Sequence, residues 1–292
     1  MGKLASFYER NCKKLFIIPL LMIVVATLVI FNFYNETGDI MNKDVSLKGG
    51  ITATIYTGNE VSLDELSNKL NEAFSDSNIR KLSEFGSTKQ LGIIVEIGEV
   101  DEPKLKSLLE GFFGFTLNDQ NYSVEVVGSS LGESFYKQMS IAILVAFLFM
   151  ALVIFLLFRN FIPSIAVVFA AFSDILITLA VVDLIGLRIG TAGIASFLLL
   201  IGYSVDTDVL LTTKVLKEKE GSLFARIYDS MRTGLTMTCS TLVALVIGYF
   251  VSTSFILKEM FLIIFIGLVA DVVVTYLGNA PLLVWYVKRK EK

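Results

Sequence analysis

Long uninterrupted apolar runs constrain this chain more than any other feature of its sequence. The stretch from Ile141 to Phe158 contains 18 consecutive residues without a polar side chain. At about 1.5 Å of rise per residue, roughly 20 apolar residues cross a hydrocarbon core of about 30 Å. Six segments have this length and composition: about 15–33, 139–158, 162–185, 191–213, 234–251 and 260–287. We therefore predict an α-helical polytopic membrane protein with six transmembrane helices.

The composition agrees with this prediction and excludes several kinds of chemistry. Of the 292 residues, 54% are apolar and 18% are charged, against about 25% charged in soluble domains. Histidine, the commonest general base and metal ligand, is absent, which excludes Ser-His catalysis and His-ligated zinc. Cys12 lies beside the basic N-terminus and Cys239 inside an apolar run, so we expect no structural disulfide. We predict no catalytic residue, no metal, no cofactor and no nucleic-acid partner.

The first apolar run has the features of a membrane anchor. From Leu15 to Phe33 it is longer than the 7–15 residues of a signal-peptide core, and it lacks an A-x-A-like cleavage site. We predict an uncleaved signal anchor and a multi-pass protein of the cell membrane.

The distribution of Lys and Arg residues predicts the orientation of the chain. Fourteen of them flank one side of the spans, whereas the short loops on the other side contain only Arg188 and Lys258. Cytoplasmic loops carry the excess of positive charge, so residues 1–14 and 288–292 are expected in the cytoplasm. The segment 34–138 is then outside. Its own basic residues do not count against this, because long domains translocate largely regardless of charge.

The segment 34–138 has the periodicity of a small folded domain. Apolar and polar residues alternate from Asp44 to Thr57, which indicates a strand. Ser62-Leu-Asp-Glu65 is a capping box that opens an amphipathic helix. Two further strands are expected at about 79–85 and 91–97.

A turn and a second helix complete this pattern. Gly86 and its polar neighbours form the turn between the two strands. Asp101, with Pro103 just inside, starts a second helix, and residues 122–127 alternate again. The order β-α-β-β-α-β is that of a ferredoxin-like domain, in which one sheet carries both helices on a single face. We therefore predict an α+β ferredoxin-like extracytoplasmic domain with its own core, followed by a bundle of five spans over 139–287.

The cytoplasmic loop 214–232 mixes apolar and charged residues. Its apolar members, Val215, Leu216, Leu223, Ile227 and Met231, stand among eight charged residues. This pattern indicates an amphipathic helix at the membrane surface. We interpret the loop as an interfacial anchor, with a coupling element to a partner as the alternative.

Four acidic residues stand out inside the predicted spans, away from the outer turn that Asp183 flanks: Asp174, Asp206, Asp208 and Asp271. A carboxylate at mid-bilayer costs at least about 2.5–3.5 kcal/mol on insertion scales, so each acid needs a reason. Asp174 and Asp271 lie at similar depths in spans that enter from opposite sides, which places both near the midplane. Asp206 and Asp208 lie closer to the cytoplasmic end and differ by about 200° around a helix axis. At most one of these two faces an internal site, unless the helix is broken at Gly202.

Hydroxyl and amide side chains follow the acids at helical spacing: Thr178 after Asp174, and Thr275 and Asn279 after Asp271. Side chains at i and i+4 share a helix face. In the fifth span a comparable stripe consists of Thr233, Thr236 and Ser240. Hydrogen bonds between helices, worth about 0.6–2 kcal/mol each, are a sufficient explanation for the hydroxyls. The acids differ, because a neutral hydroxyl would join helices at less cost.

The acids lack a compensating charge of their own. No Lys or Arg lies in the middle of any predicted span. This favours protonated carboxyl groups, or a path that water and protons enter. A cation supplied by a partner subunit is the remaining alternative. We predict proton or ion relay roles for Asp174, Asp206, Asp208 and Asp271, whereas Asp183 and Arg188, which flank an outer turn, are expected to reach water.

Three short stretches resemble a known family. Asp44-Val-Ser-Leu-Lys-Gly49-Gly50 is similar to the D-x-x-x-x-G-G element that opens the external domain of SecD and SecF, accessory subunits of the protein-export translocon. Val127-Gly128-Ser-Ser-Leu131-Gly132-Glu133 resembles their V-G-x-x-L-G-x element, and Gly202-Tyr203-Ser204 resembles the fourth-span G-Y-S motif of SecF. With six spans and one outer domain, the resemblance covers nearly the whole chain. Asp206-Thr-Asp208 departs from the bacterial N-D-T and looks like the archaeal branch of SecF.

The resemblance implies a fold, partners and a role. The fold is half of an RND-like architecture, and the partners are SecD, a SecY-type channel, a translocating polypeptide and membrane lipid. The role is that of a non-enzymatic subunit that assists export. In bacterial members an acid of the transmembrane part is tied to proton flow. Asp206 stands at that position, Asp174 aligns with an acid of the third span, and Asp271 has no counterpart.

Two other functions agree less well with the sequence. Intramembrane aspartyl proteases carry Y-D and G-x-G-D motifs in adjacent spans, whereas here Tyr228-Asp229 lies in a loop and Asp271 follows Gly-Leu-Val-Ala. An RND-type exporter of lipids or small molecules would need a dimer, because six spans and one external domain form half of the usual unit. That exporter is the alternative hypothesis.

Overall fold

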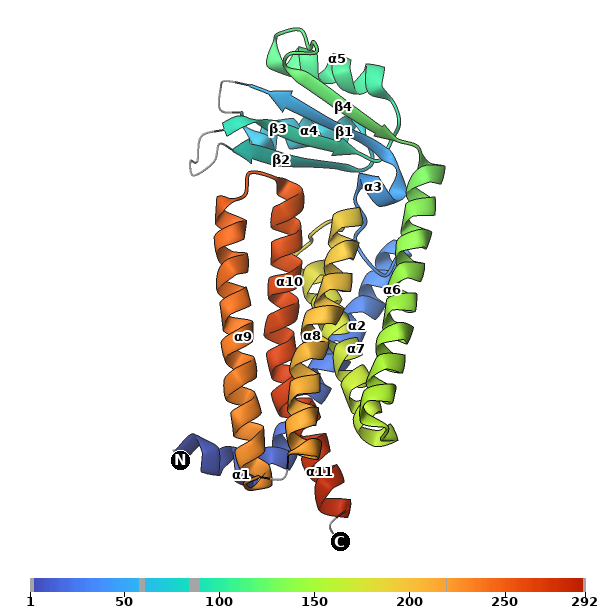
Figure 1. The fold of residues 1–292 in the computed structure, drawn as a ribbon. Coiled ribbons are helices and arrows are strands. Elements are labelled where there is room, and N and C mark those ends of the chain that lie inside the picture. Colours follow the sequence, from blue (N-terminus) through green and yellow to red (C-terminus); the bar gives the residue numbers. More distant parts are fainter. Residues whose placement is uncertain (1–2, 58–60, 84–89, 219, 291–292) are drawn as a thin grey trace.

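The computed structural model describes residues 3–57, 61–83, 90–218 and 220–290. Long helices stand side by side as a bundle, and a small sheet with two helices lies across one end of it (Figure 1). We call these parts the bundle and the sheet domain. The first helix, α1 (Lys3–Leu15), and the last, α11 (Ala280–Lys290), lie at the opposite end of the bundle.

Among the described residues, six helical segments are long and apolar enough to cross a membrane, as predicted. They are α2 (Ile17–Thr37), α6 (Ser129–Phe158), α7 (Phe161–Leu184), α8 (Thr191–Lys217), α9 (Leu223–Val251), and a composite last span of α10 (Phe255–Val273), η1 (Val274–Asn279) and α11. In the most apolar stretch of each helix, the share of residues that are buried is 56% for α7, 50% for α8 and 50% for the last span. It is 11% for each of the other three. These three helices therefore form the centre of the bundle.

The sheet domain has the predicted order β-α-β-β-α-β. Its elements are β1 (Gly50–Tyr56), α4 (Leu63–Ala73), β2 (Ser77–Ser83), β3 (Gln90–Ile97), α5 (Glu102–Phe113) and β4 (Tyr122–Val127). The described strands form one sheet in the order β2-β3-β1-β4, with antiparallel neighbours. Leu66 and Leu70 of α4 and Leu105 and Leu109 of α5 pack with Ile51 of β1 in one core, so both helices cover the same face.

Side-chain caps start both helices where the sequence predicts them. The Ser62 hydroxyl accepts a hydrogen bond from the Glu65 N–H, and the Asp101 carboxylate accepts one from the Lys104 N–H. These caps satisfy N–H groups that have no partner within the helix. The predicted turn at Gly86 lies outside the described residues.

The strand predicted from Asp44 begins later than expected. Residues Val45–Lys48 form a short helix, α3, because the Asp44 carboxylate accepts the Ser46 N–H at 2.8 Å and so caps a helical turn. Gly49 and Gly50 follow with φ of 88° and 136°, which ends the helix and starts β1. The apparent alternation at Val45 and Leu47 thus belongs to a helix whose two apolar side chains are both buried.

The prediction of a surface helix over 214–232 is wrong. Residues up to Lys217 continue α8, and Leu223 already belongs to α9. The helix that lies across this end of the bundle is α1 (Figure 1). Its Tyr8 and Cys12 are buried against Val215 and other apolar residues of α8, α9 and α11, which therefore pack within the protein rather than on lipid.

Candidate functional site

Three of the four predicted acids meet at the centre of the bundle. Asp174 comes from α7, Asp208 from α8 and Asp271 from α10, and each is 0% exposed. We call these three residues the acidic cluster. Asp174 and Asp271 are close enough to interact with one another. The structure thus joins acids that are about a hundred residues apart in the sequence.

Neutral donors surround the acidic cluster. The Ser204 hydroxyl donates to Asp174 Oδ2 at 2.5 Å. The Thr275 hydroxyl lies 2.9 Å from Asp208 Oδ1 and 3.1 Å from Asp271 Oδ1. The Asn279 amide donates to Asp208 Oδ1 at 2.7 Å. These donors come from α8 and from η1, so the same central helices supply the acids and their partners.

The cluster retains unpaired oxygens. In the part of the chain that the structure describes, Asp174 Oδ1, Asp208 Oδ2 and Asp271 Oδ2 are buried without a hydrogen-bond partner. No ion pair between described residues includes any of these acids. A buried carboxylate without a cation is strongly disfavoured, whereas a protonated carboxyl group is a donor and costs far less to bury.

The structure selects Asp208 rather than Asp206. Helix α8 runs unbroken through Gly202, so the expected separation of about 200° applies, and Asp206 is exposed on the outer side of the helix. Asp206, the residue that the resemblance matched to the proton-linked acid, is therefore outside the cluster. Of the Gly202-Tyr203-Ser204 motif, only Ser204 reaches the cluster, since the other two residues are exposed.

The last span contains a π-helical turn that sequence reasoning missed. Residues Val274–Asn279 form η1, in which the Ala280 N–H donates to Thr275 O. In a regular α-helix, residues eight apart, such as Asp271 and Asn279, differ by about 80° around the axis. Thr275 nevertheless contacts both Asp208 and Asp271, and Asn279 contacts Asp208. The wider π turn takes up one extra residue and offsets this drift. Pro281, inside the predicted span, was the available signal, because a proline removes an N–H from a helix.

Other polar residues divide between the inside and the outside of the bundle. Thr233, Thr236 and Ser240 are exposed and donate to main-chain carbonyls one turn earlier, so the predicted stripe does not face the site. The buried face of α9 instead carries Ser230, whose hydroxyl has no partner among the described residues. Thr178 is buried but donates to the Asp174 carbonyl at 2.6 Å, not to its carboxyl group.

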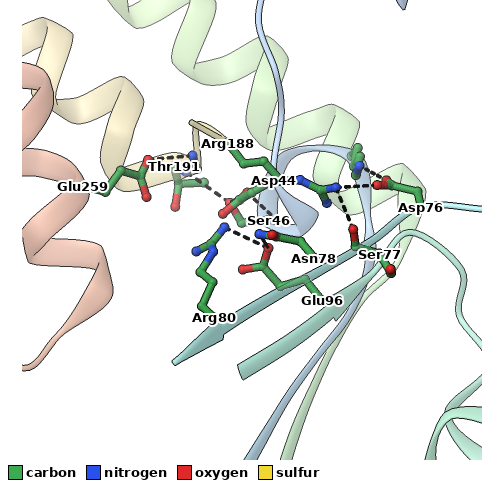
Figure 2. Close-up of polar contacts among 12 residues, drawn as sticks. Asp44, Ser46, Asp76, Ser77, Asn78, Arg80, Glu96, Arg188, Thr191 and Glu259 are labelled. Carbon is green, nitrogen blue, oxygen red and sulfur yellow. Dashed lines mark hydrogen bonds and ion pairs between the residues drawn. The ribbon is translucent and has the colours of Figure 1, made fainter. Parts of the chain in front are cut away.

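A second polar region joins the sheet domain to the bundle (Figure 2). We call it the docking interface; its members are Asn42, Asp44, Ser46, Lys48, Asp76, Ser77, Asp183, Arg188, Gly190, Thr191 and Glu259. Arg188 donates to Asp76 Oδ1 at 2.7 Å and to Ser77 O at 3.1 Å. Lys48 also pairs with Asp76. Arg188 thus makes an ion pair with the sheet domain instead of only reaching water.

The bundle side of the docking interface consists of the ends of the central helices. The Thr191 N–H at the start of α8 donates to Ser46 Oγ at 3.1 Å. The Gly190 N–H donates to Glu259 Oε1 of α10 at 2.9 Å. Asp183 of α7, expected to reach water, is buried and accepts the Asn42 N–H at 3.2 Å. The segment 42–46, which leads into the sheet domain, therefore holds the end of α7 and the start of α8, and Glu259 ties α10 to the same point.

A cavity of about 350 Å³ lies beside this interface, between the open face of the sheet and the bundle. Arg80 and Glu96 line it and form an ion pair at 2.9 Å, and the Arg80 guanidinium lies 3.8 Å from the centre of the Phe255 ring. Burial raises the pKa of Glu96 above its ordinary value, although the charge of Arg80 opposes this.

The residues of the family motifs lie mostly at the junction of the two parts. A Cβ atom at Gly132 would lie 2.6 Å from Gly49 N, and one at Gly49 would lie 2.5 Å from Ser129 Cα. Glycine at both positions therefore lets α3 touch the start of α6. Gly128 is the N-cap of α6, and Leu131 is exposed. No group of His, Cys, Asp or Glu suited to holding a metal ion occurs in the described ranges.

Comparison with known proteins identifies similar chains. Residues 108–289 match the family model of the protein export membrane protein SecD/SecF, C-terminal part. The chain is 35% identical to the protein-export membrane protein SecF of Pyrococcus furiosus over 291 residues, 99% of this chain and 96% of that one. It is also 35% identical to SecF of Methanolacinia petrolearia, over 100% of both chains.

Solved structures show the same fold. The crystal structure of SecDF, a translocon-associated membrane protein from Thermus thermophilus, superposes with a TM-score of 0.74 at 19% identity over 100% of this chain. A super-membrane-facing form of SecDF gives a TM-score of 0.65 over 96% of this chain. This chain spans 39% of each of those chains.

Proposed function

This chain belongs to the SecF family of protein-export membrane proteins, and on that premise we propose that its acidic cluster relays protons for an accessory subunit of the Sec translocon. The observation that carries the proposal is the burial of three carboxyl groups, Asp174, Asp208 and Asp271, among neutral donors and without a cation among the described residues. The similarity to SecF does not favour the alternative of a lipid or small-molecule exporter.

The chemistry of the cluster supports protons as the species that moves. Neighbouring buried carboxyl groups do not all carry a negative charge at once, because adjacent like charges repel each other strongly at low dielectric, so the cluster holds protons. The hydroxyls of Ser204 and Thr275 both donate and accept, so they can pass a proton on. Since the sequence contains no histidine, the relay uses carboxyl groups, hydroxyls and water.

We place the sheet domain outside the cell and both termini in the cytoplasm. The support is the excess of Lys and Arg at the end of the bundle that carries α1 and α11. The chain spans only 39% of the solved SecDF chains, which supports SecD as the partner that supplies the remainder. A SecY-type channel, the exported polypeptide and lipid complete the proposed surroundings, and we assign no enzymatic activity.

The docking interface supports a coupling between the sheet domain and the relay. It engages α7, α8 and α10, the three helices that carry the acidic cluster. A movement of the sheet domain would therefore be passed on to the helices that carry the acids. We propose that proton passage and movement of the outer domain are linked in this way during export.

A pair of substitutions in one helix tests the relay. We expect Asp208→Asn to abolish proton flux in proteoliposomes that contain the complex with SecD, and to reduce export of a reporter protein at least tenfold. Asp206→Asn is the matched control, two residues away on the exposed side of α8, and should leave both unchanged. Co-purification with SecD shows that the variants assemble. Normal flux and export by an assembled Asp208→Asn variant would refute the relay.

A further inference from the structure

Pro281 leaves one main-chain carbonyl of the last span without its usual donor. Within η1 the hydrogen bonds run from residue i+5 to residue i, as from the Ala280 N–H to Thr275 O. The next bond in this pattern would run from residue 281 to Tyr276 O. Residue 281 is proline and has no N–H, so the pattern stops there. A buried carbonyl without a donor costs free energy comparable to a lost hydrogen bond.

A residue from the other end of the chain replaces the missing donor. The Tyr8 hydroxyl of α1 donates to Tyr276 O at 2.6 Å, across 268 positions of sequence. Tyr8 is 8% exposed and packs with Cys12 in the cluster that joins α1 to α8, α9 and α11. Burial raises the pKa of Tyr8, so its hydroxyl keeps its proton, and remains a donor, over the whole physiological range.

The π form of this segment matters for the acidic cluster. Thr275 and Asn279 both reach Asp208 Oδ1, at 2.9 and 2.7 Å. In a continuous α-helix these two side chains would point about 40° apart, and Asn279 would lie about 80° from Asp271 around the axis. A change from π to α therefore turns Thr275 and Asn279 relative to each other and to Asp271, which alters the donor contacts of Asp208. The segment also places the buried Tyr276 hydroxyl against Gly234 of α9, where a Cβ atom would collide with it.

We propose that Tyr8 is a positioning residue that holds Val274–Asn279 in the π-helical form and thereby keeps Thr275 and Asn279 on the acidic cluster. Through this hydrogen bond the helix α1, which lies across the end of the bundle, controls the geometry of the relay. The consequence for proton passage rests on the proposed function, whereas the control of helix form does not. Tyr8 touches none of the three acids and acts only through the main chain of Tyr276.

Amide hydrogen exchange tests the control of helix form directly. We expect Tyr8→Phe, in the full-length chain in lipid nanodiscs, to speed exchange of the peptide over residues 272–282 about tenfold, the change that loss of one buried hydrogen bond gives. The matched control is Tyr286→Phe, which removes a tyrosine hydroxyl of α11 that donates to Asn160 at 3.3 Å and not to η1. Equal exchange in Tyr8→Phe and the unmutated chain overturns the proposal.

A second variant, Pro281→Ala, removes the reason why Tyr276 O lacks a main-chain donor. In Pro281→Ala the N–H at position 281 is restored, so Tyr276 O has a main-chain donor in either the π or the α form. We expect Tyr8→Phe to have no further effect on exchange in that background, and an undiminished tenfold effect would contradict the proposal. If Tyr8→Phe alone fails to fold, the double variant should fold; its failure would show that the Tyr8 hydroxyl acts other than through Tyr276 O and would overturn the proposal.

Export activity separates this inference from the relay. Tyr8→Phe should lower proton-dependent export, while Tyr286→Phe should not. Faster exchange with unchanged export would refute the control of the relay by α1. An active Asp208→Asn variant, by contrast, would refute the relay and leave the exchange result untouched.

Discussion

The ion pairs of Asp76 give the sharpest test of how the sheet domain is held on the bundle. Asp76 accepts from Lys48 of α3 and from Arg188 at 2.7 Å, and Arg188 in turn lies in the loop between α7 and α8. The side chains of Lys48, Asp76 and Arg188 are 29%, 34% and 16% exposed. Asp76→Asn keeps the shape of the side chain and removes its charge, which leaves two partly buried cations without a counter-ion.

The size of the effect follows from this partial exposure. A buried hydrogen bond to a charged group contributes about 1.5–3 kcal/mol, and an exposed ion pair about 0.2–1 kcal/mol. With one third of Asp76 in contact with water, the two pairs together stabilise the docked arrangement by about 1–2 kcal/mol. Since about 1.4 kcal/mol is a factor of ten in an equilibrium constant, Asp76→Asn should make undocking about tenfold more frequent.

The pH dependence has a definite sign. Burial alone would raise the pKa of Asp76, but the hydrogen bond from Lys48 and the charges of Arg188 and Lys48 outweigh it, so the pKa is lowered. A carboxyl group with a lowered pKa in the folded state contributes stability above its unfolded pKa of about 3.9. That contribution is lost as the pH falls through the folded-state value. The difference in undocking frequency between Asp76→Asn and the unmutated chain should therefore be at its maximum at pH 7 and shrink below about pH 4.

Amide hydrogen exchange of residues 185–192 and 42–48 measures undocking, because the main chains of Asp44 and Ile189 are hydrogen-bonded to each other there at 3.0 Å. We expect exchange about ten times faster in Asp76→Asn at pH 7. Asp119→Asn, at an exposed position of the same domain, is the control for a change of one charge. An unchanged rate at pH 7, or the same ratio of rates at pH 2, would show that the ion pairs do not hold the domain.

Two further predictions concern the junction and the cavity beside it. Gly132→Ala should destabilise the chain by about 1–3 kcal/mol, because its Cβ would lie 2.6 Å from Gly49 N. Gly128→Ala has nothing within 4 Å of its Cβ and should change stability by less than about 0.5 kcal/mol. Equal melting temperatures of the two variants in detergent would contradict this prediction. Arg80→Gln should raise the pKa of Glu96 further, because burial remains and the opposing charge is gone. Infrared titration of the Glu96 carboxyl group, assigned with Glu96→Gln, measures this change. An unshifted midpoint in Arg80→Gln would contradict the prediction.

The spans and the ferredoxin-like order were predictable because they depend on local pattern. Apolar length identifies a span, and periods of 2.0 and 3.6 residues identify strands and helices. Errors arose where a local signal competed with that pattern. At Asp44 a capping carboxylate and two glycines with positive φ produced α3 within an apparently alternating run. In the last span Pro281 produced a π turn within an otherwise regular apolar run.

Other features depend on residues that are far apart in the sequence. The apolar positions of 214–232 resemble a membrane-facing stripe because their partner, α1, lies about two hundred residues earlier. The spacing of Asp206 and Asp208 predicts that at most one faces inward, but only the packing of α8 against α10 and η1 decides for Asp208. Likewise, the partner of Asp183 is Asn42, in the segment between α2 and α3, and the partner of Arg188 is Asp76 in the sheet domain; no short pattern around Asp183 or Arg188 indicates either contact.

The positions of the family motifs argue that they specify a mechanical junction more than an ion site. Gly49 and Gly132 allow α3 and α6 to touch, and Asp44 both caps α3 and lies where a Cβ of Gly190 would be 2.5 Å from its carboxylate. Only Ser204 contacts the acidic cluster. Helix α8 carries contacts at both places, since it begins beside Gly190 and runs unbroken for 27 residues that include Ser204. An unbroken helix moves nearly as a rigid body, so a displacement at the docking interface shifts Ser204 relative to Asp174. The proposed link between the outer domain and the relay therefore requires no element beyond α8 itself.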